Sequence, residues 1–168
     1  MKSGTSAWTD GVGDASPSTV GGMRTTSTSI GLTALRIVLG VVFIAHGAQK
    51  FAQGIPGVAQ AFAGMGVPFA EVAAPVVAGL EVVGGVFLVL GVATRVVEVM
   101  LALDMVVAGL LAHAEAGFFA QDGGFEYVLV LAVASLAVAL TGPGRFSVDA
   151  LVLRSARRKR GVTEPLPA

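Results

Sequence analysis

Four apolar stretches dominate the chain, and they occupy residues 30–50, 72–92, 95–113 and 124–141. An α-helix needs about twenty residues to cross a hydrocarbon core about 30 Å thick. The first three stretches have this length. The fourth is shorter and is uninterrupted only over 127–140, so a re-entrant or buried segment is the alternative to a span. We interpret it as a span because Glu126 suits a helix start and Gly142-Pro143-Gly144 an abrupt stop.

Two shorter segments have apolar residues at helical spacing. The connection after the first stretch begins with Pro56 and ends at glycines, and the chain after the fourth stretch turns basic. Each pattern predicts a short helix that lies in the membrane interface. The apolar positions are Ile55, Val58, Ala59, Phe62 and Met65 in the first, and Val148, Leu151 and Val152 in the second. Together with the spans they predict an all-α fold, an integral membrane four-helix bundle with short interfacial helices.

Composition agrees with a membrane protein, since 54% of the residues are hydrophobic and 13% are charged. The formal net charge is zero, which does not favour nucleic acid as a partner. The basic residues gather before the first span, between the second and third, and after the fourth, so positive-inside counting predicts that both termini are cytoplasmic. We expect a disordered tail at 1–29, a membrane domain at 30–153 and a basic tail at 154–168 that binds anionic lipids.

Three charged residues fall inside the predicted spans, on three different helices. Counting about 1.5 Å per residue places Arg36 in the inner leaflet, with Glu81 and Asp104 near the midplane. Because a lone charge there costs roughly 2.5–3.5 kcal/mol, we expect Arg36 to pair with one or both acids. One cation facing two carboxylates leaves one acid over, as a proton or quinone site needs. A purely structural role for the three residues is the equal alternative.

A second polar layer is expected near the outer surface. His46 and Lys50 are four residues apart on one helical face, and His113 ends the third span at the same depth. These three side chains could form a water-facing pocket that titrates near neutrality. A metal site is not expected, because the two histidines do not share one helix at a ligand spacing.

The stretches LRIVLGVVFIAHGAQKF, GLEVVGGVFLVLGVATR and GGFEYVLVL, followed by GPGRFSVDAL, occur in an order that resembles the DoxX family of small bacterial membrane proteins. The resemblance covers about residues 32–153. It implies a four-helix bundle in the bacterial plasma membrane, crossing it several times, and a link to thiosulfate:quinone oxidoreductase activity. It also implies family motif positions at Arg36, His46-Gly47, Lys50, Glu81 and Gly84-Gly85.

The sequence contains no cysteine, so a thiol relay or an iron–sulfur centre cannot be built from this chain. This fits a subunit that assists the chemistry of another protein. With the activity that the resemblance implies and the surplus carboxyl, our leading hypothesis is the membrane subunit of a redox system that works with a soluble redox partner. A quinone is the candidate cofactor, and Arg36, Glu81, Asp104, His46, Lys50 and His113 are the candidate site residues. A non-catalytic membrane anchor or scaffold for soluble proteins is the alternative. A proton-coupled transporter is a third hypothesis, which would require a homo-oligomer.

Overall fold

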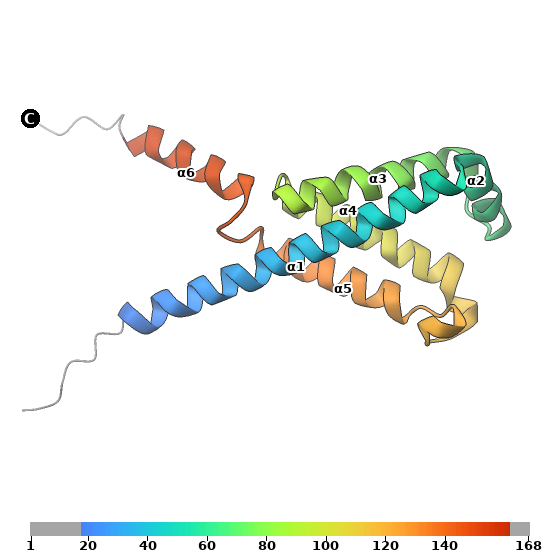
Figure 1. Cartoon of the computed structure of the whole chain (residues 1–168), viewed down its shortest axis with the longest axis horizontal. Helices are drawn as coiled ribbons and strands as arrows, with labels where there is room; N and C mark the ends of the chain where they lie inside the picture. Colours follow the sequence, from blue (N-terminus) through green and yellow to red (C-terminus); the bar gives the residue numbers. More distant parts are fainter. Residues whose placement is uncertain (1–17, 162–168) are drawn as a thin grey trace, which may run out of the picture.

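The computed structural model describes residues 18–161, with side chains over residues 26–156. Every long element in this part is a helix, and four of them run alongside one another (Figure 1). The predicted all-α membrane bundle is therefore confirmed. The helices are α1 (Ser18–Gln53), α2 (Ile55–Gly64), α3 (Ala70–Leu90), α4 (Thr94–Ala108, continued by single turns to Ala116), α5 (Glu126–Thr141) and α6 (Val148–Gly161).

Three helices are long and apolar enough to cross a membrane, and they contain residues 26–53, 70–90 and 94–116. The predicted fourth span, α5, has 16 residues and stays shorter than the usual crossing length. It packs mainly against α4 and so completes the bundle. The bundle is therefore made of three full-length helices and one short helix.

The first helix begins well before the predicted start at Ile30. Residues 18–29 are helical, so this part of the predicted disordered tail is wrong. Glycine, serine and threonine lower helix propensity by less than about 1 kcal/mol each, which the continuation of a long helix can overcome. Residues 1–17 and 162–168 lie outside the described part, and so do the ends of both predicted tails.

Glycines bring α1 and α3 into direct backbone contact. A methyl group on Gly40 would lie 2.6 Å from the Gly85 carbonyl oxygen, and one on Gly85 would lie 2.6 Å from the Gly40 oxygen. Gly47 meets Ala78 in the same way at 2.8 Å. Gly79, which lies on the same helix as Gly85, has no neighbour within 4 Å and takes no part. These contacts fix the antiparallel register of the two helices.

The apolar core lies between α1, α3, α4 and α5 and includes Phe43, Leu88, Leu101 and Leu131. The predicted interfacial helix is present as α2, which begins at Gly54-Ile55-Pro56 and buries Val58 and Ala59 against Ala74 of α3. In Figure 1, α2 lies at one end of the bundle, and α6 extends from the other. The side chains of Leu151, Val152 and Leu153 on α6 are exposed, as expected for an interfacial helix.

The connection between α5 and α6 is fastened to the end of the bundle from which α6 extends. The Arg36 guanidinium donates to the carbonyl oxygens of Pro143 (3.1 Å) and Phe146 (2.8 Å). The Asp149 carboxylate accepts hydrogen bonds from the backbone N–H groups of Ala93 and Thr94, both at 2.9 Å, at the start of α4. It thereby satisfies orphan donors of that helix end. We call this end of the bundle the inner end and the opposite end the outer end.

Candidate functional site

A cavity of about 430 Å³ opens within the outer half of the bundle. Its walls are largely apolar, and polar side chains enter it from α1, α3, α4 and α5. Cavities of this size with few polar groups are typical of small-molecule sites. Polar and aromatic members of the lining are His46, Lys50, Glu81, Asp104, His113 and Tyr127, and apolar members include Phe43, Phe62, Met65, Met105, Leu111 and Leu131.

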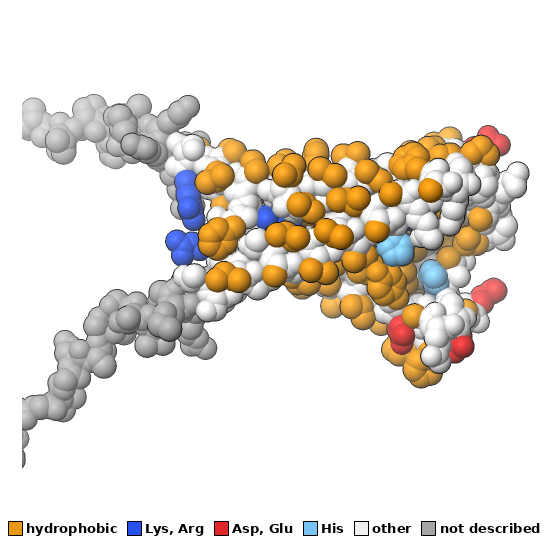
Figure 2. Space-filling model, viewed as in Figure 1, with side chains coloured by type: hydrophobic (Ala, Val, Ile, Leu, Met, Phe, Trp, Pro, Cys, Tyr) orange, Lys and Arg blue, Asp and Glu red, His pale blue; other side chains and the backbone are white. Residues whose placement is uncertain are grey.

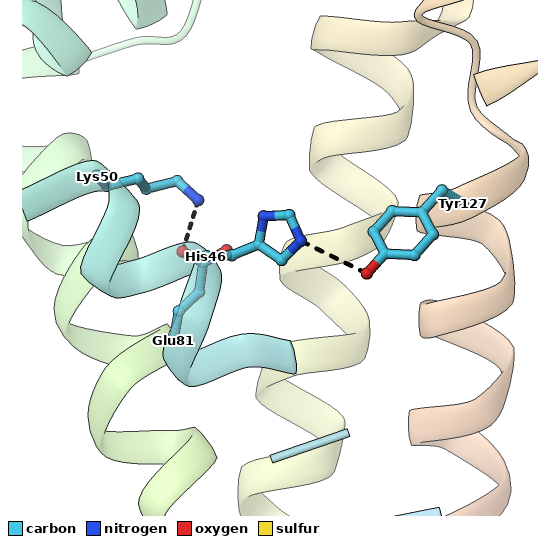
Figure 3. Close-up of polar contacts among 4 residues, drawn as sticks. All are labelled: His46, Lys50, Glu81 and Tyr127. Carbon is cyan, nitrogen blue, oxygen red and sulfur yellow. Dashed lines mark hydrogen bonds and ion pairs between the residues drawn. The ribbon is translucent and has the colours of Figure 1, made fainter. Parts of the chain in front are cut away.

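An ion pair between α1 and α3 forms one side of the cavity. Lys50 Nζ lies 2.5 Å from Glu81 Oε2, and the dashed line in Figure 3 marks this contact. The Glu81 side chain is 2% exposed and that of Lys50 is 22% exposed. Removing either partner would leave a charge in a poorly solvated position. The pair is therefore a structural link that also presents an ammonium group to the cavity.

The pairing of Lys50 with Glu81 differs from the prediction. Gly40 faces Gly85 and Gly47 faces Ala78, so Glu81 lies between these two contacts. Helical side chains lean toward the helix N-terminus, and Lys50 therefore points back into the bundle toward Glu81 rather than outward. The expected pair of Arg36 with Glu81 or Asp104 is wrong, because Arg36 binds the carbonyls of Pro143 and Phe146 instead.

Asp104 on α4 supplies a second carboxyl group to the same cavity. Its Oδ2 atom is buried and has no hydrogen-bond partner. The Lys50–Glu81 pair lies near enough to interact electrostatically with it. One cation thus faces two acids, and Asp104 is the acid left over. The surplus carboxyl that the sequence predicts is present, with Lys50 in place of Arg36 as its cation.

Aromatic side chains adjoin these charges at the cavity wall. His46 Nε2 lies 3.5 Å from the Tyr127 hydroxyl oxygen of α5, and Figure 3 shows the imidazole between Lys50 and Tyr127. His113 also lines the cavity, and its Nδ1 lies 2.6 Å from the Gly123 carbonyl oxygen. The predicted grouping of His46, Lys50 and His113 around one pocket is therefore present. Within the described residues, no three histidine, aspartate or glutamate side chains are gathered closely enough to hold a metal ion.

Sequence reasoning missed a buried polar group near the inner end. Glu98 is fully buried, and neither of its carboxyl oxygens has a hydrogen-bond partner. Ser135 of α5 lies near enough to interact with this carboxyl, although no well-formed hydrogen bond joins them. Counting about 1.5 Å per residue along the predicted third span places Glu98 near its cytoplasmic end, where a solvent-exposed carboxylate is expected. The alanines around Ser135 are the one sequence feature that could have predicted close packing of α5 against α4 at this position.

Known protein families and proteins match the part of the chain that forms these helices. The model of the DoxX family matches residues 31–114, half of the chain, which includes most of α1 and all of α2, α3 and α4. The chain is 36% identical over 131 residues to a Bacillus subtilis (strain 168) protein named "Putative oxidoreductase CatD". That alignment covers 78% of this chain and 93% of the relative. No solved structure matches the chain at a significant level.

Proposed function

Because the chain belongs to the DoxX family of membrane proteins, we propose that it is the membrane subunit of a redox system and that its outer cavity binds a quinone. The observation that carries this proposal is the surplus carboxyl of Asp104 beside the Lys50–Glu81 pair, inside an apolar cavity of about 430 Å³. The word oxidoreductase in the name of the relative supports the redox class.

A quinone ring suits this donor set. Apolar side chains of α2 and α4, among them Phe62 and Met105, can pack against a ring and its tail. The polar groups project from α1, α3, α4 and α5 and can orient the two carbonyl oxygens. The buried Oδ2 of Asp104, which has no protein partner, marks where a ligand hydrogen bond would form.

The residues of this chain would bind and move protons rather than supply electrons. A quinone held there would supply the redox chemistry, taking two electrons from a redox partner protein and two protons. The Lys50 ammonium can donate a hydrogen bond to one carbonyl oxygen, and Glu81 holds that ammonium in place. Asp104 can carry a proton, since burial without a paired cation favours the neutral acid. His46, next to the Tyr127 hydroxyl, can exchange a proton with water at the outer surface.

Photolabelling locates the site. We expect an azido-quinone, added to the protein in lipid nanodiscs, to label cavity residues such as Met105 and Leu111 of α4. An excess of unlabelled quinone should abolish this labelling, and Glu81→Gln should reduce it because Lys50 loses its support. Labelling confined to the lipid-facing surface, or labelling that competitor leaves unchanged, would refute the quinone site.

We further propose that the inner end faces the cytoplasm and that the protein resides in the plasma membrane with both termini inside. On the visible face, lysine and arginine side chains gather at the inner end and acidic side chains at the outer end, which supports this orientation (Figure 2). The exposed apolar face of α6 and its basic residues would then rest on anionic lipids.

The orientation can be tested directly because the chain contains no cysteine. We expect a single cysteine at Gln121, in the exposed outer loop, to react with an impermeant maleimide in intact cells. A single cysteine at Ser155, exposed on α6, should react only after the membrane is permeabilised. The reverse pattern would place the termini outside.

A further inference from the structure

The inner half of the bundle contains a second cluster of buried polar groups, separate from the outer cavity. Six buried side-chain atoms of the described residues lack a hydrogen-bond partner, and only Asp104 Oδ2 belongs to the outer cavity. The other five are Arg36 Nε, Thr94 Oγ1, both carboxyl oxygens of Glu98 and Ser135 Oγ. We call Arg36, Thr94, Glu98 and Ser135 the inner polar cluster.

These four residues converge from three helices. Thr94 and Glu98 are four residues apart on one face of α4. Ser135 approaches the Glu98 carboxyl from α5, and the Arg36 guanidinium on α1 interacts electrostatically with the same carboxyl. Each of the four is at most 1% exposed. Buried polar groups are almost always hydrogen-bonded to protein or to internal water. Five buried polar atoms without a protein partner, on side chains that face the same part of the bundle, therefore fit a site that holds internal water.

The cation that faces Glu98, Arg36, also faces a second acid and two backbone carbonyls. Asp149 at the start of α6 also interacts electrostatically with Arg36. The guanidinium itself directs two N–H groups at the carbonyls of Pro143 and Phe146. The acids of α3 (Glu71 and Glu81) and of α5 (Glu126) lie toward the outer end. Glu98 thus resembles Asp104. One cation, Arg36, faces the two acids Asp149 and Glu98, and the carboxyl on α4 is left without a cation of its own.

We propose that the inner polar cluster is a proton-binding site, in which Glu98 carries a proton and hydrogen-bonds to internal water shared with Thr94, Ser135 and Arg36. A neutral carboxylic acid supplies one donor and two acceptor positions, which water and the Ser135 hydroxyl can satisfy. Glu98 and Asp104 are six residues apart, about 9 Å along α4 at 1.5 Å per residue. This helix would then carry one exchangeable proton in each half of the membrane.

Infrared spectroscopy of the full chain in lipid, without any quinone, tests the site. We expect a C=O stretching band of neutral carboxylic acid near neutral pH that loses one component in Glu98→Gln and a different component in Asp104→Asn. Ser135→Ala should shift the Glu98 component, because the acid loses a hydrogen-bond partner. The exposed acid Glu115, changed to Gln, is the matched control and should leave the band unchanged. The Glu98 component should also shift in heavy water without unfolding.

Two outcomes would overturn the proposal. An unchanged band in Glu98→Gln would show that Glu98 is ionised, and a Glu98 component that keeps its position in heavy water would show a dry site. Thermal unfolding gives an independent measure, because Gln imitates a neutral acid but not an anion paired with Arg36. We expect Glu98→Gln to keep the melting temperature of the wild type, and a marked drop would contradict the neutral form. Failure of these tests leaves the quinone-binding proposal for the outer cavity untouched.

Discussion

Replacing Gly85 by alanine is expected to destabilise the bundle by about 1–3 kcal/mol, the usual range for overpacking a well-packed interface. The added methyl group would lie 2.6 Å from the backbone oxygen of Gly40, 2.8 Å from Ile44 Cγ1 and 2.9 Å from the Ile44 nitrogen. Two of these atoms belong to the backbone of α1, which cannot rotate away as a side chain can. The helices α1 and α3 must therefore separate, and the register that brings Glu81 within reach of the Lys50 side chain loosens with them.

Gly79→Ala is the matched control for this change, since it lies on the same helix with no atom within 4 Å of the added methyl group. Alanine in a helix interior is favoured over glycine by roughly 0.5–1 kcal/mol. The control should therefore unfold at the wild-type temperature or slightly above it. The measurement is thermal unfolding of both variants in the same detergent. Equal melting temperatures for the two variants would refute the direct contact between α1 and α3.

Replacing Lys50 by methionine is expected to cost about 3 kcal/mol, the lower end of the range for breaking a buried ion pair. The lower end applies because the Lys50 side chain is 22% exposed and is partly solvated, whereas Glu81 is almost completely buried. Methionine preserves the apolar stem of the lysine, so most of the loss comes from the unpaired Glu81 carboxylate. The same variant should also lower the affinity of the outer cavity for a quinone.

Combining Lys50→Met with Glu81→Gln tests whether this loss of stability comes from the Lys50–Glu81 ion pair. In the double variant no charge is left unpaired, so we expect it to recover most of the stability that Lys50→Met loses. The coupling energy between the two sites should exceed about 1 kcal/mol, as for residues in direct contact. Arg145→Met, at an exposed cation, is the control and should change little. Additive losses for Lys50 and Glu81 would show that the two side chains do not interact.

The sequence predicts the helices well because their signal is local. Runs of apolar residues define three spans by length alone, and the spacing of Ile55, Val58 and Phe62 predicts α2. The candidate site residues follow from the same runs, since every charge within a span stands out. Of the six candidates, five line one cavity, and only Arg36 lies elsewhere.

The pairing within the site is not local and could not be predicted in the same way. An estimate of membrane depth from residue number treats each side chain as level with its own Cα atom. The partner of Lys50, however, is decided by the register of α1 against α3. That register depends on which glycines meet, and the sequence does not distinguish Gly79 from Gly85. The partners of Arg36 are backbone carbonyls near Pro143 and Phe146, which no side-chain pattern reveals. Glu98 was overlooked because its burial depends on α5.

The central claim is that Asp104 and its neighbours in the outer cavity bind a quinone. Its most direct test is the dissociation constant of a soluble short-chain quinone, titrated against the protein in nanodiscs. Asp104→Leu should weaken binding by about tenfold or more, which corresponds to the loss of one hydrogen bond worth roughly 1.5 kcal/mol. Asp122→Leu removes an exposed acid at the same end that does not line the cavity, and it should bind like the wild type. Equal affinities for the wild type and both variants would contradict the claim.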